Sequence, residues 1–258
     1  MIHTTQLKRS YSTSGSCDAA GVKKLLVVSH TEGFRHTEGI EAGEPVLVQL
    51  SAKTGQFSVD FCRNAEEVKQ MLVPEYLKPY DGVIFLNTTG NLGIPDLDAF
   101  LSWIKDGHAF IGIHAAADTY RADPETAGYI EMIGGEFRGH NSQCTVTPDL
   151  DDPQHPSVTP LGEDFSILDE IYLYKNNDRN KLHALLSVNK GPDDGSDEAG
   201  KPGDYLLAWN KMYGSGSVFY TAFGHRQDVW ENQKFQGHLL GGILWALGIV
   251  PGSAELPK

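Results

Sequence analysis

The stretch Phe110-Ile-Gly-Ile-His-Ala-Ala-Ala-Asp118 is an apolar run that stops at a histidine and continues with small residues and a carboxylate. An apolar run without alternation is typical of a strand that is buried on both faces of a parallel sheet. The small residues after it allow a helix to begin close to the end of the strand. We therefore expect His114 at the carboxyl edge of the sheet, where open α/β sheets bind their ligands.

Three other apolar segments, residues 24–29, 82–87 and 216–225, are also predicted to be strands, and each one ends close to a polar side chain. If these strands are parallel, their ends meet at the same edge of the sheet as His114. Convergence of this kind is what a functional site requires. The alternative is that surface loops simply favour polar residues. The side chains in question are His30, Asn87 and His225.

Between these strands the apolar residues follow the period of a helix. In residues 95–105 the side chains of Leu97, Phe100, Leu101 and Ile104 recur at i, i+3, i+4 and i+7. The first half alternates strands with helical connections that are long enough for right-handed parallel crossovers. This order predicts a flavodoxin-like, doubly wound α/β fold with a mostly parallel sheet and helices on both faces.

The second half has a different character. Short alternating or extended segments over 143–147 and 164–174, followed by strands over 181–188 and 205–209, predict an irregular, β-rich region. A final helix ends near Gly248. No repeat and no linker divides the chain. We expect a disordered leader over residues 1–21, a single domain over 22–250 and a tail over 251–258.

Composition and charge exclude several classes of function. The chain has 258 residues, 40% of them hydrophobic, which suffices for the core of one large α/β domain. Its formal net charge of -13 argues against binding to a phosphate backbone, so nucleic acid is not an expected partner. No apolar run approaches the roughly 20 residues that a membrane helix requires, so we expect a soluble protein without a membrane partner.

The cysteines and the leader give weaker indications. Cys17, Cys62 and Cys144 are odd in number and lack CxxC spacing, so neither a disulfide framework nor a thiolate zinc site is expected. The leader has no apolar core of the kind that a secretory signal needs, which favours the cytoplasm. The oligomeric state stays open, with a homodimer as one option.

Several nucleophile and cofactor motifs are missing. No G-x-S-x-G occurs, and no cysteine stands at the predicted turn after residue 113. The first strand is not followed by a G-x-G-x-x-G fingerprint. Covalent acyl transfer and dinucleotide binding by that route are therefore disfavoured. Histidine, in contrast, suits acid, base or ligand roles because its reference pKa is about 6.5. Two histidines, His108 and His238, are expected to be structural, since they lie away from this edge.

With these pieces assembled, the chain resembles the ThuA-like family, named for trehalose utilisation and related to class I glutamine amidotransferase domains. The resemblance covers about residues 23–248 and is carried by five segments together. They are Gly33-Phe-Arg-His36, Gly112-Ile-His-Ala-Ala-Ala-Asp118, Gly134-Gly-Glu-Phe137 with His140, Asp169-Glu-Ile-Tyr172, and Tyr220-Thr-Ala-Phe-Gly-His225.

The resemblance implies a role in sugar catabolism. The amidotransferase relatives carry a cysteine at the turn and a His-x-Glu after a late strand, whereas the matching positions here are His114 and His225 with Gln227. Glutaminase activity is therefore not expected, although Asp228 lies nearby in sequence. The implied substrates are disaccharides or glycosides that partner dehydrogenases have oxidised to 3-keto forms.

A mechanism follows as a hypothesis. A 3-keto group makes the adjacent C–H acidic, so a histidine base and a cation or donor at the developing enolate could drive elimination, hydrolysis or isomerisation. We assign His114 and His225 to base or ligand roles and Asp118 to orienting a histidine. Spacing along the chain does not show whether histidines converge on a metal, so a divalent cation is a possible cofactor with unknown ligands. The expected substrate-binding residues are His30, Glu32, Arg35, His36, Asn87, His140, Glu170 and Tyr172.

Two other functions compete with this hypothesis. The first is a non-catalytic sugar-binding or regulatory module, whose stacking surfaces would be Tyr120, Tyr172, Tyr174 and Trp230. The second is amidase-like hydrolysis by another nucleophile. An aromatic-rich edge with few perturbed histidines would favour the first of these.

Overall fold

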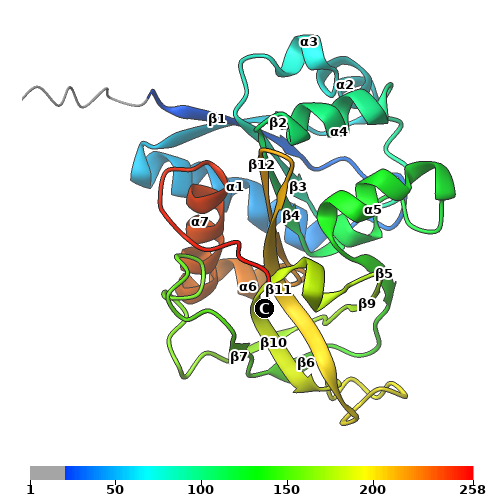
Figure 1. Cartoon of the computed structure of the whole chain (residues 1–258), viewed down its shortest axis with the longest axis vertical. Coiled ribbons are helices and arrows are strands. Elements are labelled where there is room, and N and C mark those ends of the chain that lie inside the picture. The colour runs from blue at the N-terminus through cyan, green and yellow to red at the C-terminus, as the bar shows by residue number, and fades with distance from the viewer. Residues whose placement is uncertain (1–20, 258) are drawn as a thin grey trace, which may run out of the picture.

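An eight-stranded sheet forms the centre of the protein in the computed structural model, which describes residues 21–257 (Figure 1). Its order is β2-β1-β3-β4-β12-β11-β10-β7, and the first five strands in that order are parallel. In chain order these five strands are arranged 2-1-3-4-5, which is the flavodoxin-like order predicted from the sequence. They are β1 (Lys23–Val28), β2 (Phe57–Cys62), β3 (Gly82–Leu86), β4 (Ala109–Ile113) and β12 (Gly216–Thr221).

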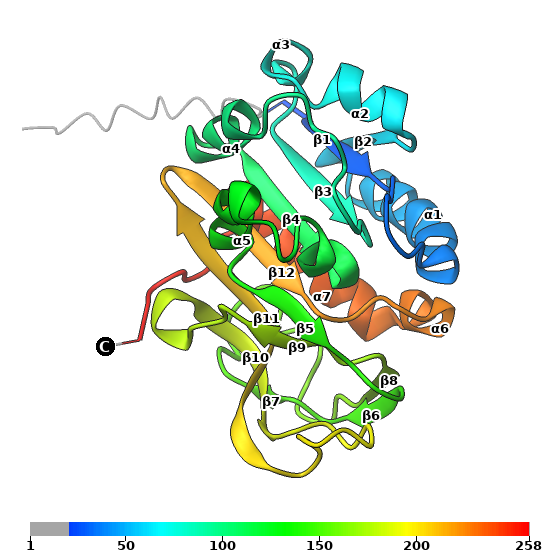
Figure 2. The ribbon, with the colours of Figure 1, turned by 90° about the vertical axis from the view of Figure 1, so that its right-hand side faces the viewer.

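Three antiparallel strands continue this sheet, and two small sheets lie beside it. The small strands pair as β5 with β9 and β6 with β8, all antiparallel. They lie at the end of the molecule away from α2, α3 and α4 (Figures 1 and 2). The predicted irregular, β-rich second half is thus confirmed. The strands are β5 (Glu136–Gly139), β6 (Cys144–Val146), β7 (Asp149–Leu150), β8 (Ile167–Asp169), β9 (Leu173–Lys175), β10 (His183–Lys190) and β11 (Pro202–Tyr213).

Helices cover both faces of the sheet, as the sequence predicts (Figure 2). One face carries α1 (Thr37–Thr54), α6 (Gln227–Glu231) and α7 (Gln233–Ala246). The other carries α2 (Ala65–Met71), α3 (Pro74–Leu77), α4 (Leu97–Lys105) and α5 (Ala127–Ile133). Short 3-10 turns complete the list: η1 (His114–Asp118), η2 (Pro124–Thr126) and η3 (Arg179–Lys181).

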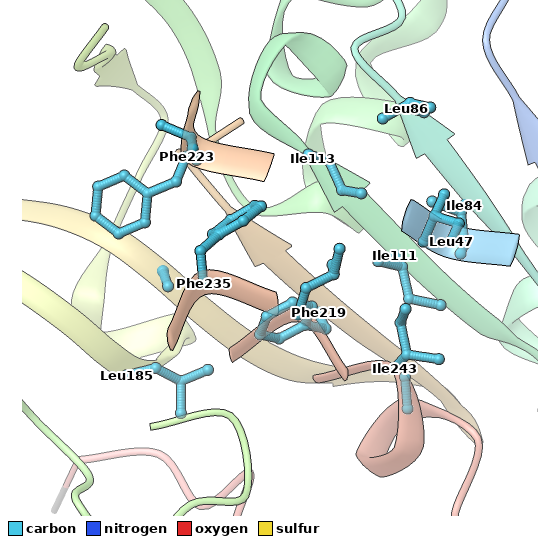
Figure 3. Close-up of a cluster of buried hydrophobic side chains, with 14 of the residues drawn as sticks. Leu47, Ile84, Leu86, Ile111, Ile113, Leu185, Phe219, Phe223, Phe235 and Ile243 are labelled. Atoms are coloured by element: carbon cyan, nitrogen blue, oxygen red, sulfur yellow. The ribbon is translucent and has the colours of Figure 1, made fainter. Parts of the chain in front are cut away.

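Two buried apolar clusters hold these layers together. In the first, Phe235 and Ile243 of α7 pack on Phe219 of β12 and Ile111 of β4 (Figure 3). The second lies on the opposite face, where the predicted periodicity of α4 places Phe100 among buried aromatic rings. Because apolar surface is buried on both faces of β3, β4 and β12, these strands are held in place, and so are the positions of their carboxyl ends.

The predicted leader falls outside the described residues, apart from Gly21, and so does Cys17. In the described part of the chain no helix combines the length and the apolar character needed to cross a membrane. Localisation in the cytoplasm stays a prediction.

Strained backbone marks two of the strand ends. Asn87 follows β3 with φ 52°, and His114 follows β4 with φ 46°. Residues other than glycine rarely adopt this left-handed conformation, and those that do cluster at functional sites. The turn after β4 therefore has the strand-to-turn geometry predicted from the sequence, and His114 is its first residue.

Candidate active site at the carboxyl edge of the sheet

Four side chains from separate parts of the chain meet at this edge, and we name them the Glu170 cluster: His36, His114, Glu170 and His225. One nitrogen from each histidine and one carboxylate oxygen of Glu170 lie within 4.8 Å of one another. His36 precedes α1, His114 follows β4, and His225 follows β12. Three histidines after three strands are brought together because these strands are parallel and adjacent or nearly so.

Glu170 is the centre of this arrangement. Its side chain is only 8% exposed, and among the described residues its ion-pair partners within 4.0 Å are all histidines. One oxygen of the Glu170 carboxylate, Oε1, lies 3.2 Å from His140 Nδ1. The distances from Oε2 are 3.1 Å to His225 Nδ1, 3.4 Å to His114 Nε2 and 3.9 Å to His36 Nε2.

The segment that carries Glu170 differs from the sequence prediction. Residues 164–174 alternate in polarity and were expected to be extended, but β8 ends at Asp169 and β9 begins at Leu173. Glu170 and Tyr172 lie in the irregular connection between two small sheets. Both side chains nevertheless reach the cluster, since the Tyr172 hydroxyl lies 3.3 Å from His36 Nε2.

A backbone carbonyl fixes the tautomer of His114. The Nδ1 atom lies 2.7 Å from the Ala222 carbonyl oxygen, which can only accept, so Nδ1 carries the hydrogen. The Nε2 atom then faces His225 Nδ1 at 3.3 Å. Burial lowers the pKa of His114 to about 4, so the ring is neutral near pH 7 with its Nε2 lone pair directed into the cluster.

The histidines and the carboxylate shift each other's pKa. Burial raises the pKa of Glu170, but the surrounding histidines outweigh this effect and hold the pKa of the carboxyl well below its usual range. Burial alone would lower the pKa of His225, yet the Glu170 carboxylate raises it above the usual value. The cluster is therefore an ionised carboxylate surrounded by imidazoles.

A second buried carboxylate, which sequence reasoning missed, positions the cluster. Asp169 Oδ1 accepts a hydrogen bond of 2.9 Å from the Glu170 backbone N–H, and its Oδ2 accepts one of 2.7 Å from the Gly224 N–H. The Asn87 amide donates to the Gly224 carbonyl at 3.0 Å. Asp169 thus joins the loop after β12 to the segment of Glu170. The only signal in the sequence was its place beside Glu170.

A cavity of about 270 Å³ lies near the cluster, although none of the four cluster residues lines it. Phe34 lines it with a ring that is 70% exposed and 4.9 Å, centroid to centroid, from the His36 ring. A larger groove of about 1040 Å³ shares one lining residue, Asp123, with this cavity. The other residues around the smaller cavity include Gly33, Asn91, Asp118, Tyr120 and Arg121.

Asp118 does not have the position expected of it. The structure pairs its Oδ1 with Arg121 Nε at 2.6 Å, without the alignment of a hydrogen bond, and no described histidine bonds to it. Glu170 contacts the histidines instead. Burial raises the pKa of Asp118 even though the Arg121 guanidinium acts in the opposite direction. Asp118 is therefore a carboxyl with free hydrogen-bonding capacity in the cavity wall.

Other predicted residues lie near the site without joining the cluster. His30 pairs with Glu32 at 2.8 Å, and Arg35 donates to the Ser29 carbonyl at 3.0 Å. Asn87 holds the loop after β12, as described above. His140 is the most accessible histidine beside Glu170, with 35% of its side chain exposed.

The structure also bears on the competing functions. Tyr120, Tyr172 and Trp230 are at most 3% exposed, so these rings are not available to stack on a sugar. Burial raises the pKa of Cys62 to about 12 and that of Cys144 to about 11, so neither thiol is a ready nucleophile.

Comparisons with known proteins give a consistent result. The model of the ThuA family, described as trehalose utilisation, matches residues 24–246. The fold is similar to that of a ThuA-like protein from Bacteroides uniformis, with a TM-score of 0.70 and 21% identity over 93% of this chain and 95% of that one. A ThuA-like protein from Parabacteroides merdae gives a TM-score of 0.65 and 18% identity over 90% and 92% of the two chains.

A weaker likeness extends to part of a larger enzyme. A β-galactosidase from Bacillus circulans matches with a TM-score of 0.52 and 10% identity, over 90% of this chain but 31% of that one. At such identities the likeness concerns the fold alone. A search of curated protein sequences finds no match to this chain.

Proposed function

The chain belongs to the ThuA family of trehalose utilisation, and from this premise we propose that it is an enzyme of carbohydrate catabolism that acts on glycosides at the Glu170 cluster. The observation that carries the proposal is the gathering of three histidines and one carboxylate at the carboxyl edge of the sheet, where the His36 ring contacts Phe34 in the wall of a cavity. A protein that only bound sugar would gain nothing from this costly arrangement, because buried charge and buried polar groups are destabilising.

The two adjoining spaces suit a glycoside. The 270 Å³ cavity is close to the lower end of the range of small-molecule sites and is large enough for one sugar ring. The exposed face of Phe34 offers a surface on which an apolar face of that ring can stack. The groove beyond Asp123 can accept the rest of the molecule.

Proton transfer falls to groups that a substrate can reach. The His114 side chain is fully buried and cannot touch the sugar, whereas Asp118 and His140 retain exposed side-chain surface. The Asp118 carboxylate therefore serves as the base, and His140 as the donor. The His225 imidazole of the Glu170 cluster supports the developing negative charge.

The proposed substrate is a 3-keto glycoside, and the favoured reaction is elimination. Asp118 removes the proton on C2, which the C3 carbonyl makes acidic. The electrons of that C–H bond form the C1–C2 double bond, and the bond from C1 to the glycosidic oxygen breaks. The leaving oxygen takes a proton from His140, which releases an alcohol and an unsaturated keto sugar. Hydrolysis gives the same alcohol after addition of water.

The test compares 3-keto trehalose and 3-keto sucrose with the unoxidised sugars, using mass spectrometry to follow release of the free sugar. We expect turnover of the keto forms alone and a loss of at least about 100-fold in Asp118→Asn. Asp106→Asn, an exposed carboxyl at the end of α4, is the matched control and should keep full activity. Binding of the sugars without turnover of any of them would contradict the proposed enzyme and favour the non-catalytic sugar-binding module.

A further inference from the structure

We propose that the Glu170 cluster binds one divalent transition-metal ion of the kind that prefers imidazole ligands, such as Zn²⁺. The catalytic use of such an ion rests on the proposed function, but its binding does not. The inference comes from the distances, the hydrogen bonds around the cluster and the chemistry of its four donors.

The distances fit a metal site. Tetrahedral Zn²⁺ with bonds of 2.0–2.1 Å holds neighbouring donor atoms about 3.3 Å apart. Glu170 Oε2 lies 3.1 Å from His225 Nδ1, which lies 3.3 Å from His114 Nε2, and His114 Nε2 lies 3.4 Å from Glu170 Oε2. The fourth donor, on His36, is farther from Oε2 at 3.9 Å. Three donors thus already form a triangle of the right size.

Two potential ligand atoms face each other inside this triangle. Because His114 Nδ1 donates to the Ala222 carbonyl, its Nε2 is the ring nitrogen turned toward the other members of the cluster. It lies 3.4 Å from Glu170 Oε2, a buried carboxylate oxygen without a hydrogen-bond partner in the described part of the chain. A metal ion between these two atoms would be bound by both.

The surroundings provide what metal ligands usually have. A histidine ligand typically donates its second ring N–H to a carbonyl or carboxylate, as His114 does to Ala222. Glu170 is held in turn by its own hydrogen bonds: Oε1 faces His140, and its backbone N–H donates to Asp169. The cluster is buried except for His225, whose side chain is 20% exposed and offers a path of entry.

The donor set and the charge indicate the class of ion. Three imidazoles with one carboxylate suit Zn²⁺, Fe²⁺, Co²⁺ or Ni²⁺ better than Mg²⁺ or Ca²⁺, which prefer oxygen ligands. In the described part of the chain no lysine or arginine lies within 4.0 Å of Glu170, so a divalent ion is the natural counterion. When bound, the ion would supply a Lewis acid for a carbonyl oxygen.

The alternative is a cluster held by protons alone. A proton on His114 Nε2 or on His225 Nδ1 would also bridge the facing ligand atoms. This alternative makes a different prediction, because it requires no metal and leaves stability unchanged when metals are added or removed.

The test is metal binding by the full chain without any affinity tag. After dialysis against EDTA the protein is titrated with Zn²⁺, and bound metal is counted by inductively coupled plasma mass spectrometry. Co²⁺ is used in parallel because its visible absorption reports the number and type of its ligands. We expect one equivalent of either ion, no displacement by millimolar Mg²⁺, and a Tm that rises on loading.

The variants decide which residues hold the ion. Glu170→Gln and His225→Ala should each weaken Zn²⁺ binding by at least 100-fold. His30→Ala, in the loop after β1 but outside the cluster, should bind like the wild type. Circular dichroism shows whether each variant is folded, and His225, being partly exposed, is the safer of the two. Absence of stoichiometric Zn²⁺ and Co²⁺ binding in the folded wild type, or full binding by both folded variants, would overturn the inference.

The outcome separates this inference from the proposed function. Metal binding without turnover of any keto sugar supports the metal site and excludes the proposed enzyme activity. Turnover that survives complete removal of metal supports the proposed enzyme and excludes a catalytic role for the ion.

Discussion

Glu170 Oε2 and His114 Nε2 face each other at 3.4 Å, and the fold holds both groups in place. Asp169 accepts a hydrogen bond from the Glu170 backbone N–H, and the Ala222 carbonyl accepts one from His114 Nδ1. We regard this contact as the best structural indication of function in the molecule.

Removing the accessible histidine of the cluster tests its role in turnover. We expect His225→Ala to lower kcat on a 3-keto glycoside by at least about 100-fold, the usual range for loss of a positioned acid, base or ligand group. His108→Ala, at the opposite end of β4, should change kcat by less than about threefold. A loss below tenfold in both His225→Ala and His114→Ala would show that the chemistry takes place elsewhere.

Shortening the exposed aromatic ring tests the sugar cavity. Phe34→Ala should raise KM by about fivefold with little change in kcat, because a stacking contact contributes about 1 kcal/mol. The free energy of unfolding should stay within about 0.5 kcal/mol, since the ring is 70% exposed. Val48→Ala removes another exposed apolar side chain, from α1, and should leave KM unchanged. Equal KM values for both variants would exclude Phe34 from the binding site.

A helical glycine next to the site provides a test of packing. Alanine in a helix is usually favoured over glycine by 0.5–1 kcal/mol, but a Cβ at Gly39 would lie 2.5 Å from the Gly224 carbonyl oxygen. We expect Gly39→Ala to lower the free energy of unfolding by about 1–3 kcal/mol, as overpacking does. Urea denaturation measures it.

The matched control is Gly128→Ala in α5, where the new Cβ would meet only the end of the flexible Leu101 side chain. This variant should be neutral or slightly stabilised. A stable Gly39→Ala protein would mean that the start of α1 is not packed against the loop of Gly224.

Folding stability should decrease in acid because of a histidine outside the active site. Burial lowers the pKa of His238 to about 4, whereas an unfolded histidine titrates near 6.5. As the pH falls below 6.5 the unfolded chain takes up a proton that the folded one does not, so stability is lost. Between pH 7.5 and pH 5 this single group accounts for about 2 kcal/mol.

His238→Gln isolates this contribution, because glutamine does not titrate and can still bond to the Ser157 carbonyl and Thr221. Urea unfolding at pH 7.5 and pH 5 should show a pH dependence that is smaller by about 2 kcal/mol in the variant. If the two proteins lose the same stability, His238 is not a buried neutral ring.

Much of the site could be predicted from the sequence, and the reason is topological. Once the apolar runs before Asn87, His114 and His225 are recognised as parallel strands, their ends must share an edge of the sheet. The central role of Glu170 could not be predicted, because its segment joins two small sheets whose pairing leaves no periodic pattern. The same holds for Asp118, whose pairing with Arg121 depends on the shape of a 3-10 turn.

Distances between side chains were also beyond sequence reasoning. That His225 approaches His114 to 3.3 Å depends on the course of the loop after β12, which Asp169 and Asn87 fix through Gly224. Loops of this kind are determined by long-range hydrogen bonds, whereas strands and helices are largely determined by local apolar patterns.

The four members of the Glu170 cluster are spread from residue 36 to residue 225, so a fragment carries the complete set only if it spans that whole range. A ribosome must therefore finish β12 and its following loop before the set can assemble. Any ligand that recognises the whole cluster will distinguish mature protein from nascent chains and from proteolytic fragments. Loading of the cluster can thus serve as a direct assay for completed folding during purification.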